Sequence, residues 1–314
     1  MKELLLLLGL LAAFTVEAQT WPTRPVRLII PFPPGGGTDL ASRSVASRIA
    51  EAIGQPVVPE NRPGAGGTIG ADAVAKAAPD GYTIGTATSS THPAAVALQK
   101  GVPYDPVKDF APITQIASTS FVLLGSPTLP AQSFKDLVTY AKQNPGKLNV
   151  AHVGTTTLGY LQTLQLASLT GIDLQPVQYK GSSQVYPDLI SGQVQLFLDN
   201  PGASTPLVAA GKLRAFGVTT PTPSMPGVPR FVEQGLQGYD EDFWYGLVAP
   251  AGTPRPIIER IQKAVAAYVQ SEEGKKEFAA RSLVPLGTTP DEFAAAIRTE
   301  METFRGLAAR LIKQ

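Results

Sequence analysis

The sequence lacks cysteine and has only two histidines, His92 and His152. The absence of cysteine excludes disulfide bonds, thiolate zinc sites and cysteine nucleophiles. Two histidines offer little material for a metal site or a catalytic triad, so we expect neither a metal nor a catalytic residue. The 26 basic and 25 acidic residues give a formal net charge of +1, which creates no field for a polyanion. We therefore expect no nucleic-acid partner.

The N-terminus carries an apolar run, Leu4–Leu11, which is too short to serve as a comfortable bilayer span. Lys2 precedes this run, and Val16-Glu17-Ala18 after it fits the small-x-small pattern of a signal-peptidase site. We interpret residues 1–18 as a signal peptide that exports the protein to the periplasm.

The rest of the chain has the composition of a globular protein. Its 314 residues are 43% apolar and 16% charged, which is enough for two domains with a sizeable core. Patterns of strand, loop and helix alternate at the spacing of βαβ units, and this alternation indicates an α/β protein with parallel strands. Ligands of such sheets bind beyond the carboxyl ends of the strands.

The chain is organised around the stretch from Val26 to Asp39. The apolar run Val26–Ile30 predicts a buried strand, and Gly35-Gly36-Gly37 follows it. A helix is predicted to begin at once, because apolar residues then recur four positions apart, at Ala41, Val45 and Ile49. Glycines let the backbone approach a ligand, and the free N–H groups of a first helical turn attract anions.

A tight capped turn is the structural alternative for these three glycines, but a plain turn does not require their entropic cost. Their spacing fits neither the dinucleotide fingerprint nor the phosphate-binding loop, so we expect no cofactor. A second glycine-rich loop, Gly64–Gly67, is interpreted as structural and packed against the first.

Three more predicted strands end in polar loops that can hold a ligand. Tyr82–Ala87 leads into Thr88-Ser89-Ser90, Leu148–Val153 into Gly154-Thr155-Thr156-Thr157, and Val194–Leu198 into Asp199-Asn200. Hydroxyl groups donate to carboxylate oxygens without adding charge. Asp199 either orients a bound water, accepts from a ligand donor or caps a turn. Because few cationic side chains lie in these loops, the sequence argues against a fully ionised tricarboxylate.

Several motifs resemble one family in its order along the chain. They are Pro31-Phe32-Pro33-Pro34-Gly35-Gly36, Glu60–Gly67, Ala77–Thr83, the surface connection Tyr104–Phe110, Tyr179-Lys180-Gly181-Ser182, Gly211–Ala215 and Leu247–Pro254. Together they resemble the Bug-type periplasmic solute-binding proteins of tripartite tricarboxylate transporters. The run Thr155–Tyr160 departs from the Ser-x-x-His-Leu pattern of many members, so the resemblance does not transfer a particular ligand.

The resemblance implies an α/β, two-lobe periplasmic-binding-protein fold of the type II-like, Venus-flytrap kind, with crossover strands. Lobe 1 would comprise residues 19–121 and 245–314, and lobe 2 residues 122–244. Family ligands are mostly small carboxylates, held by backbone N–H groups and waters more than by arginines. The candidate ligand-binding residues are Phe32, Gly36, Gly37, Thr38, Asp39, Thr88, Ser90, Gly154, Thr155, Thr156, Asp199 and Asn200.

The leading hypothesis is an extracytoplasmic receptor that captures a small organic carboxylate by lobe closure. The ligand would be a dicarboxylate, a tricarboxylate or an aromatic carboxylate. The expected partners are this ligand and the membrane components of a tripartite tricarboxylate-type transporter. Two alternatives stay open at this point: a ligand-loaded partner of a membrane signalling protein, and a secreted hydrolase with a hydroxyl nucleophile. The hydrolase has little support, because no Gly-x-Ser-x-Gly elbow is present.

Overall fold

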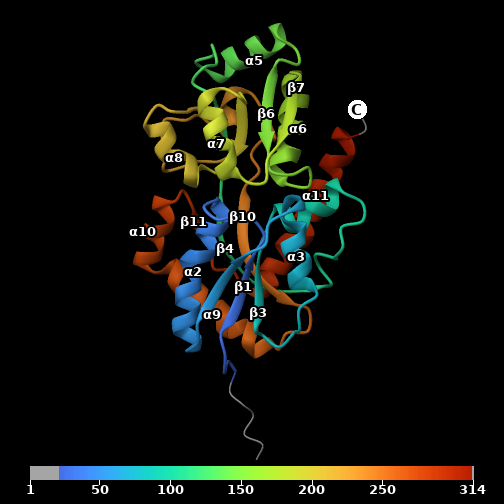
Figure 1. Cartoon of the computed structure of the whole chain (residues 1–314), viewed down its shortest axis with the longest axis vertical. Helices are drawn as coiled ribbons and strands as arrows, with labels where there is room; N and C mark the ends of the chain where they lie inside the picture. Colours follow the sequence, from blue (N-terminus) through green and yellow to red (C-terminus); the bar gives the residue numbers. More distant parts are fainter. Residues whose placement is uncertain (1–20, 313–314) are drawn as a thin grey trace, which may run out of the picture.

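The computed structural model describes residues 21–312. The predicted signal peptide, residues 1–18, lies outside the described residues. Two sheets with flanking helices form the described chain, and Figure 1 shows one below the other along the long axis. We call these the lower part and the upper part of the molecule. The predicted α/β class is confirmed, and within residues 21–312 no helix is both long and apolar enough to cross a bilayer.

The lower sheet has the strand order β11-β4-β10-β3-β1-β2. Its strands are β1 (Val26–Ile30), β2 (Val57–Asn61), β3 (Thr83–Thr88), β4 (Phe110–Thr119), β10 (Phe243–Pro250) and β11 (Val284–Pro285). The strands β1, β2 and β3 run parallel as expected, whereas β10 and β4 lie antiparallel to their neighbours, so the sheet is mixed. The sequence pattern did not indicate β4, in which Pro112 and polar residues interrupt the apolar run.

The upper sheet has the order β7-β6-β8-β5-β9. Its strands are β5 (Val122–Gly125), β6 (Leu148–His152), β7 (Leu174–Gln178), β8 (Leu196–Asp199) and β9 (Arg214–Val218). β6 pairs in parallel with β7 and β8, while β5 is antiparallel to β8 and β9. The loops after β6, β7 and β8 therefore leave the same edge of this sheet, which faces the lower part (Figure 1).

Helices cover both sheets, as Figure 1 shows. Those of the lower part are α2 (Gly37–Ile53), α3 (Thr68–Ala75), α4 (Ala95–Leu98), α9 (Arg255–Gln270), α10 (Glu272–Ala280) and α11 (Pro290–Leu311). Those of the upper part are α5 (Phe134–Gln143), α6 (Leu158–Thr170), α7 (Ser182–Ser191) and α8 (Pro201–Ala209). Three short helical turns, η1 (Ala65–Gly67), η2 (Ser90–Ala94) and η3 (Phe231–Gln234), complete the set.

Local sequence signals set most helix ends. A capping box at Thr289 and Glu292 starts α11, and Ser133 with Asp136 starts α5 in the same way. Gly54 ends α2 in the left-handed conformation, as expected for a C-terminal glycine. Thr253 does not cap α9: its hydroxyl donates to the Pro250 carbonyl, and the helix starts at Arg255 after Pro254.

The chain passes between the two sheets twice. Ser120 and Phe121 join β4 to β5, and the segment from Thr219 to Asp242 leads from β9 back to β10. The two passages are bonded to each other: the Thr219 N–H donates to the Phe121 carbonyl, and the Phe121 N–H donates to the Thr219 hydroxyl, both at 2.9 Å. The predicted lobe boundary at 121/122 lies at the end of the first passage, and the one at 244/245 lies just inside β10, after the second. The division into lobes stays a prediction.

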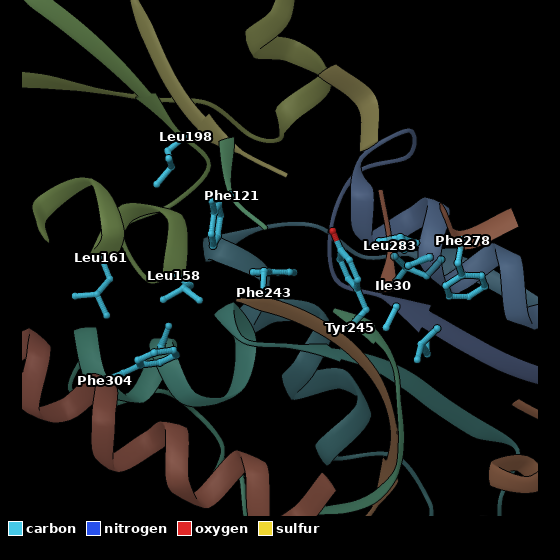
Figure 2. Packing of buried hydrophobic residues seen from close by; sticks show 14 of the residues in the cluster. Ile30, Phe121, Leu158, Leu161, Leu198, Phe243, Tyr245, Phe278, Leu283 and Phe304 are labelled. Atoms are coloured by element: carbon cyan, nitrogen blue, oxygen red, sulfur yellow. The ribbon is translucent and has the colours of Figure 1, made fainter. Parts of the chain in front are cut away.

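One hydrophobic cluster runs through the junction of the two parts. Figure 2 shows Phe121 and Leu198 from the upper side meeting Phe243 and Tyr245 of β10. The Phe121 and Phe243 rings pack edge to face with centroids 5.5 Å apart, and Phe243 and Tyr245 follow at 5.0 Å. Such aromatic pairs have a defined geometry, so the junction is packed like a core and fixes how the loops above it meet.

Candidate functional site

A cavity lies where the facing loops of the two parts meet. Its volume is about 60 Å³, which is room for several water molecules. The lower part contributes Phe32, Pro33, Gly36, Gly37, Thr38, Ser90 and Phe243. The segment from Phe121 onward contributes Phe121, Val153, Thr157, Gly159, Gly181, Ser182, Ser183, Leu198, Asp199 and Asn200. Neither lysine nor arginine nor histidine is among these lining residues.

Four helices begin at the wall of this cavity. Gly36 and Gly37 start α2, Thr157 caps α6, Gly181 precedes α7 and Asn200 caps α8. The first N–H groups of a helix have no acceptor within it and carry the positive end of the helix dipole. The four helix starts bring the positive ends of their dipoles to one space without a cationic side chain, an arrangement that favours an anion, although Asp199 adds one acidic group to the wall.

A partly buried hydrogen-bond network holds the first glycine loop in place. The Asp39 carboxylate accepts from the Gly35 N–H at 3.1 Å, from Arg43 Nε at 2.8 Å and from Asn61 Nδ2 at 2.9 Å. The same Asn61 amide donates to the Phe32 carbonyl at 2.9 Å. Asp39 therefore points away from the cavity and ties both ends of the loop to β2. Asp39 does not line the cavity, unlike its neighbours Gly37 and Thr38.

Tyr245 connects α2 to the opposite wall. Its hydroxyl donates to Asn200 Oδ1 at 3.0 Å, and a Cβ added to Gly37 would lie 2.4 Å from the same hydroxyl oxygen. A side chain at residue 37 would therefore collide with Tyr245, so glycine is required by the close approach rather than by the turn. The close approach of α2 to Tyr245 lets backbone N–H groups, rather than side chains, form this wall.

Asp199 is the one acidic residue of the lining. Burial raises the pKa of its carboxyl to about 6, although the Tyr186 hydroxyl donates to Oδ2 at 2.7 Å and favours the charged form. The other titratable group near it, Tyr245, is a fully buried phenol. Asp199 is therefore close to neutral in weakly acidic solution and charged above it, which makes the acceptor and donor capacity of this wall depend on pH.

Seven of the twelve predicted site residues line the cavity, namely Phe32, Gly36, Gly37, Thr38, Ser90, Asp199 and Asn200. The others lie outside it for identifiable reasons. At the end of β3, the Thr88 N–H donates to the Thr91 hydroxyl and the Thr91 N–H donates to the Thr88 hydroxyl. The Thr88 hydroxyl is therefore engaged within this turn. Thr155 is exposed to solvent. Asp39 is hydrogen-bonded to the first glycine loop on the side away from the cavity. Gly154 and Thr156 contact the second glycine loop.

The second glycine loop forms a direct contact between the two parts. A Cβ on Gly154 would lie 2.7 Å from the Gly66 Cα, and one on Gly66 only 1.9 Å from Thr156 Oγ1. The Thr156 hydroxyl donates to the Ala65 carbonyl at 3.2 Å, and the Leu158 N–H donates to Ser90 Oγ at 3.0 Å. Gly64–Gly67 thus packs against the first loop through Phe32, as interpreted from the sequence, and also against the upper part.

Several lining residues were not among the candidates. Gly181, Ser182 and Ser183 follow β7 and start α7, which is the same strand, glycine and helix order that marked Gly35–Thr38. Thr157 and Gly159 lie at the start of α6, one and three residues beyond the candidate Thr156. The order of strand, polar loop and helix therefore marked these five residues in the sequence. The apolar lining residues Phe121, Val153, Leu198 and Phe243 carry no such signal, because their patterns only indicate core strands.

Neither histidine is arranged for catalysis. His92 is fully buried among aromatic rings, with Phe110 at 4.6 Å between centroids, and burial lowers its pKa to about 3. His152 Nδ1 accepts from the Gly154 N–H at 3.2 Å, and burial lowers its pKa as well. Within residues 21–312, no three or more histidine, aspartate or glutamate side chains gather where they could hold a metal ion.

The model of the tripartite tricarboxylate transporter family receptor matches residues 41–301. The chain belongs to this family. Among curated relatives of the receptor, protein BugT of Bordetella pertussis (strain Tohama I) is 34% identical over 316 residues, covering 98% of this chain and 97% of BugT. The predicted resemblance to Bug-type proteins is therefore confirmed. The family is one of receptors rather than enzymes.

Solved structures agree with this assignment of the receptor. The periplasmic binding protein BugD has a TM-score of 0.88 at 30% identity, covering 93% of this chain and 98% of BugD. The structure of R. palustris Rpa4515 with adipate has a TM-score of 0.88 at 35% identity, covering 92% of this chain and 98% of Rpa4515. The predicted two-lobe periplasmic-binding-protein fold is confirmed, and the chain is a solute-binding receptor of this family.

Replacing Gly66 by alanine tests the contact between the two parts. Gly66 has φ of +65° and Gly54 has φ of +74°, but only at Gly66 would a Cβ meet the opposite part, since nothing lies within 4 Å of Gly54. Both changes should cost about 1–2 kcal/mol of backbone strain. Only Gly66→Ala should also enlarge the radius of gyration in small-angle scattering. Equal scattering from Gly66→Ala and Gly54→Ala would contradict the contact.

Replacing Asp199 by asparagine tests its raised pKa. The folded pKa of about 6 lies above the ordinary value of 3.8, so folding takes up a proton between them, and this contribution to stability is lost as pH rises through that range. At pH 7.5, Asp199→Asn should therefore be more stable than the parent protein by on the order of 1–3 kcal/mol. Urea unfolding should show the difference vanish below about pH 4. A difference that is the same at both pH values would refute the assignment.

Proposed function

We propose that the protein is a periplasmic receptor for a small organic carboxylate, bound in the cavity between its two lobes. The single observation that carries the proposal is that four helix N-termini converge on one cavity that has no cationic side chain. A carboxylate oxygen is the acceptor that such N–H groups require. The serine and threonine hydroxyls at these helix starts add donors without adding charge.

The known ligand of a solved relative supports this choice. Rpa4515 is a structure with adipate, a carboxylate, and its fold matches nearly the whole of this chain. The family description, a tripartite tricarboxylate transporter receptor, supports the same ligand class. The absence of arginine and lysine from the lining favours an acid that brings one carboxylate into this cavity over an ion whose three carboxylates all need partners.

Binding would proceed by closure of the lobes. Two of the contacts between the facing loops, Ser90 to Leu158 and Thr156 to Ala65, are single hydrogen bonds made by small side chains. The two passages between the sheets are bonded side by side, which suits a hinge that keeps the lobes in register. Closure over a carboxylate would exclude water and strengthen each N–H contact.

Binding of dicarboxylates to protein freed of carried-over ligand by unfolding and refolding tests the proposal. Titration calorimetry with adipate, succinate, citrate and benzoate should yield at least one acid that binds, and its uncharged diamide or amide should not bind. Gly37→Val should weaken that binding at least about tenfold, because the side chain collides with Tyr245 and covers N–H donors.

The matched control is Gly227→Val, since nothing lies within 4 Å of Gly227. Both variants should unfold cooperatively, and Gly227→Val should bind as the parent protein does. If none of the acids binds the refolded protein, or if the uncharged amides bind equally well, the carboxylate proposal fails.

The partner would be the membrane part of a tripartite tricarboxylate-type transporter, to which the closed receptor delivers its ligand. Affinity capture from detergent-solubilised membranes of the source organism should then retain a multi-spanning protein when the receptor carries ligand, and less of it without ligand. Capture of a membrane kinase in its place would favour the signalling alternative.

A further inference from the structure

Helix α10 is followed by a serine in the left-handed conformation, where other helices of this protein have glycine. The glycines that follow α2, α6 and α7 in this conformation are Gly54, Gly171 and Gly192. After α10 the left-handed residue is Ser282, with φ of +60°. The turn has the bonding of a glycine-capped helix end, since the Leu283 N–H donates to the Phe278 carbonyl at 2.9 Å. A serine in this conformation costs free energy that a glycine does not.

The Ser282 side chain makes contacts that a glycine could not make. Its hydroxyl is hydrogen-bonded to the Ser224 hydroxyl and lies 3.4 Å from Thr205 Oγ1. The Ser224 and Thr205 hydroxyl oxygens are 3.2 Å apart. Ser282 belongs to the lower part, Thr205 to α8 of the upper part, and Ser224 to the second passage between the sheets. Figure 1 shows α8 above α10 and β11 on one side of the molecule, so this cluster of three hydroxyls joins the two parts there.

The three hydroxyls form a series of hydrogen bonds that ends on α8. Thr205 donates its single hydroxyl hydrogen to the Pro201 carbonyl at 2.8 Å, so it can only accept from the two serines. One serine donates to the other, and the second serine then donates to Thr205. The series therefore ends at Pro201, the first residue of α8, which directly follows Asn200 in the cavity wall.

The turn that carries Ser282 lies directly behind that wall. The residues on either side of Ser282 and the starts of α2 and α8 together line a void of about 10 Å³, with Arg281, Leu283, Gly37 and Asn200 on its surface. The Ser282 carbonyl accepts from the Thr119 hydroxyl at 2.8 Å, at the last residue of β4. The main chain of Ser282 is thus fixed to the lower part, while its hydroxyl reaches the upper part.

We propose that Ser282 is a positioning residue for the binding site, whose hydroxyl holds α8, and with it Asn200, against the lower part when the lobes are closed. The inference deepens the proposed function and rests on it. A glycine would end α10 without strain, and the contact between the lobes offsets the cost of the serine. Without this hydroxyl the closed arrangement loses a contact, and the lobes separate more readily.

Two substitutions separate this role from that of a helix cap. Ser282→Gly and Ser282→Ala both remove the hydroxyl, but only glycine relieves the left-handed conformation, so Ser282→Gly should be the more stable variant in urea unfolding. Both should nevertheless weaken binding about two- to tenfold in titration calorimetry, the value of one neutral hydrogen bond. The probe is whichever of adipate, succinate, citrate and benzoate binds the parent protein most tightly.

A distance between the two parts gives a second readout that needs no ligand. Because the chain has no cysteine, Lys212→Cys after α8 and Lys276→Cys on α10, both at exposed positions, can carry a pair of spin labels. In the ligand-free protein, Ser282→Gly and Thr205→Val should each shift the measured distances to longer values. The matched control is Thr205→Ser, which keeps the hydroxyl and should retain the distances of the parent protein.

The outcomes separate the two proposals. If none of the acids binds the parent protein, the proposed function fails, and the spin-label distances still decide whether Ser282 holds α8. If Ser282→Gly leaves these distances unchanged, the serine is only a helix cap and the inference is refuted, whatever the affinity. Equal distances in Thr205→Val and Thr205→Ser would refute it as well.

Discussion

The rest of the structure depends on the convergence of four helix N-termini, with their first backbone N–H groups, on one cavity. Such groups cost free energy when they are buried, unless water or an anion meets them. Because no lysine, arginine or histidine lines the cavity, these N–H groups supply its positive potential, and Asp199 is the one acidic side chain beside them. The short residues around them, Gly37, Gly159 and Gly181, leave these donors uncovered, and this explains why the loops are poor in large side chains.

The same need for bare backbone governs how the two parts meet. Gly154 touches Gly66, and Gly181 lies so close to Pro33 that an added Cβ would be 2.6 Å from its ring. Side-chain bulk at either contact would hold the parts apart and open the cavity to water. The short passage at Ser120 and Phe121 allows little sideways displacement, so facing loops meet in one register. Glycines in this protein therefore serve the approach of surfaces as much as the turning of the chain.

The sequence predicted the elements and caps that neighbouring residues determine, and it missed those that depend on contacts with residues far away in the chain. The strand Val26–Ile30, the glycine turn and α2 follow from neighbouring residues, as do the capping boxes of α5 and α11. The strand β4 was missed because pairing with β10, not its own pattern, makes it a strand. Thr156 looked like a ligand donor, yet its hydroxyl bonds to Ala65, 91 residues away, which no local pattern reveals.

Asp199 shows how such a site can discriminate between anions without charge pairing. The helix starts attract any small anion, so they cannot by themselves distinguish one acid from another. A charged carboxylate in the wall repels a second one, whereas a protonated carboxyl donates to it, and the pKa of about 6 places that change close to neutrality. A ligand group with a hydrogen-bond donor pairs with the charged carboxylate of Asp199. An ionised carboxylate of the ligand pairs with the protonated carboxyl of Asp199. In the proposed receptor, Asp199 would therefore discriminate between ligand groups at this end of the cavity by matching hydrogen-bond donors to acceptors.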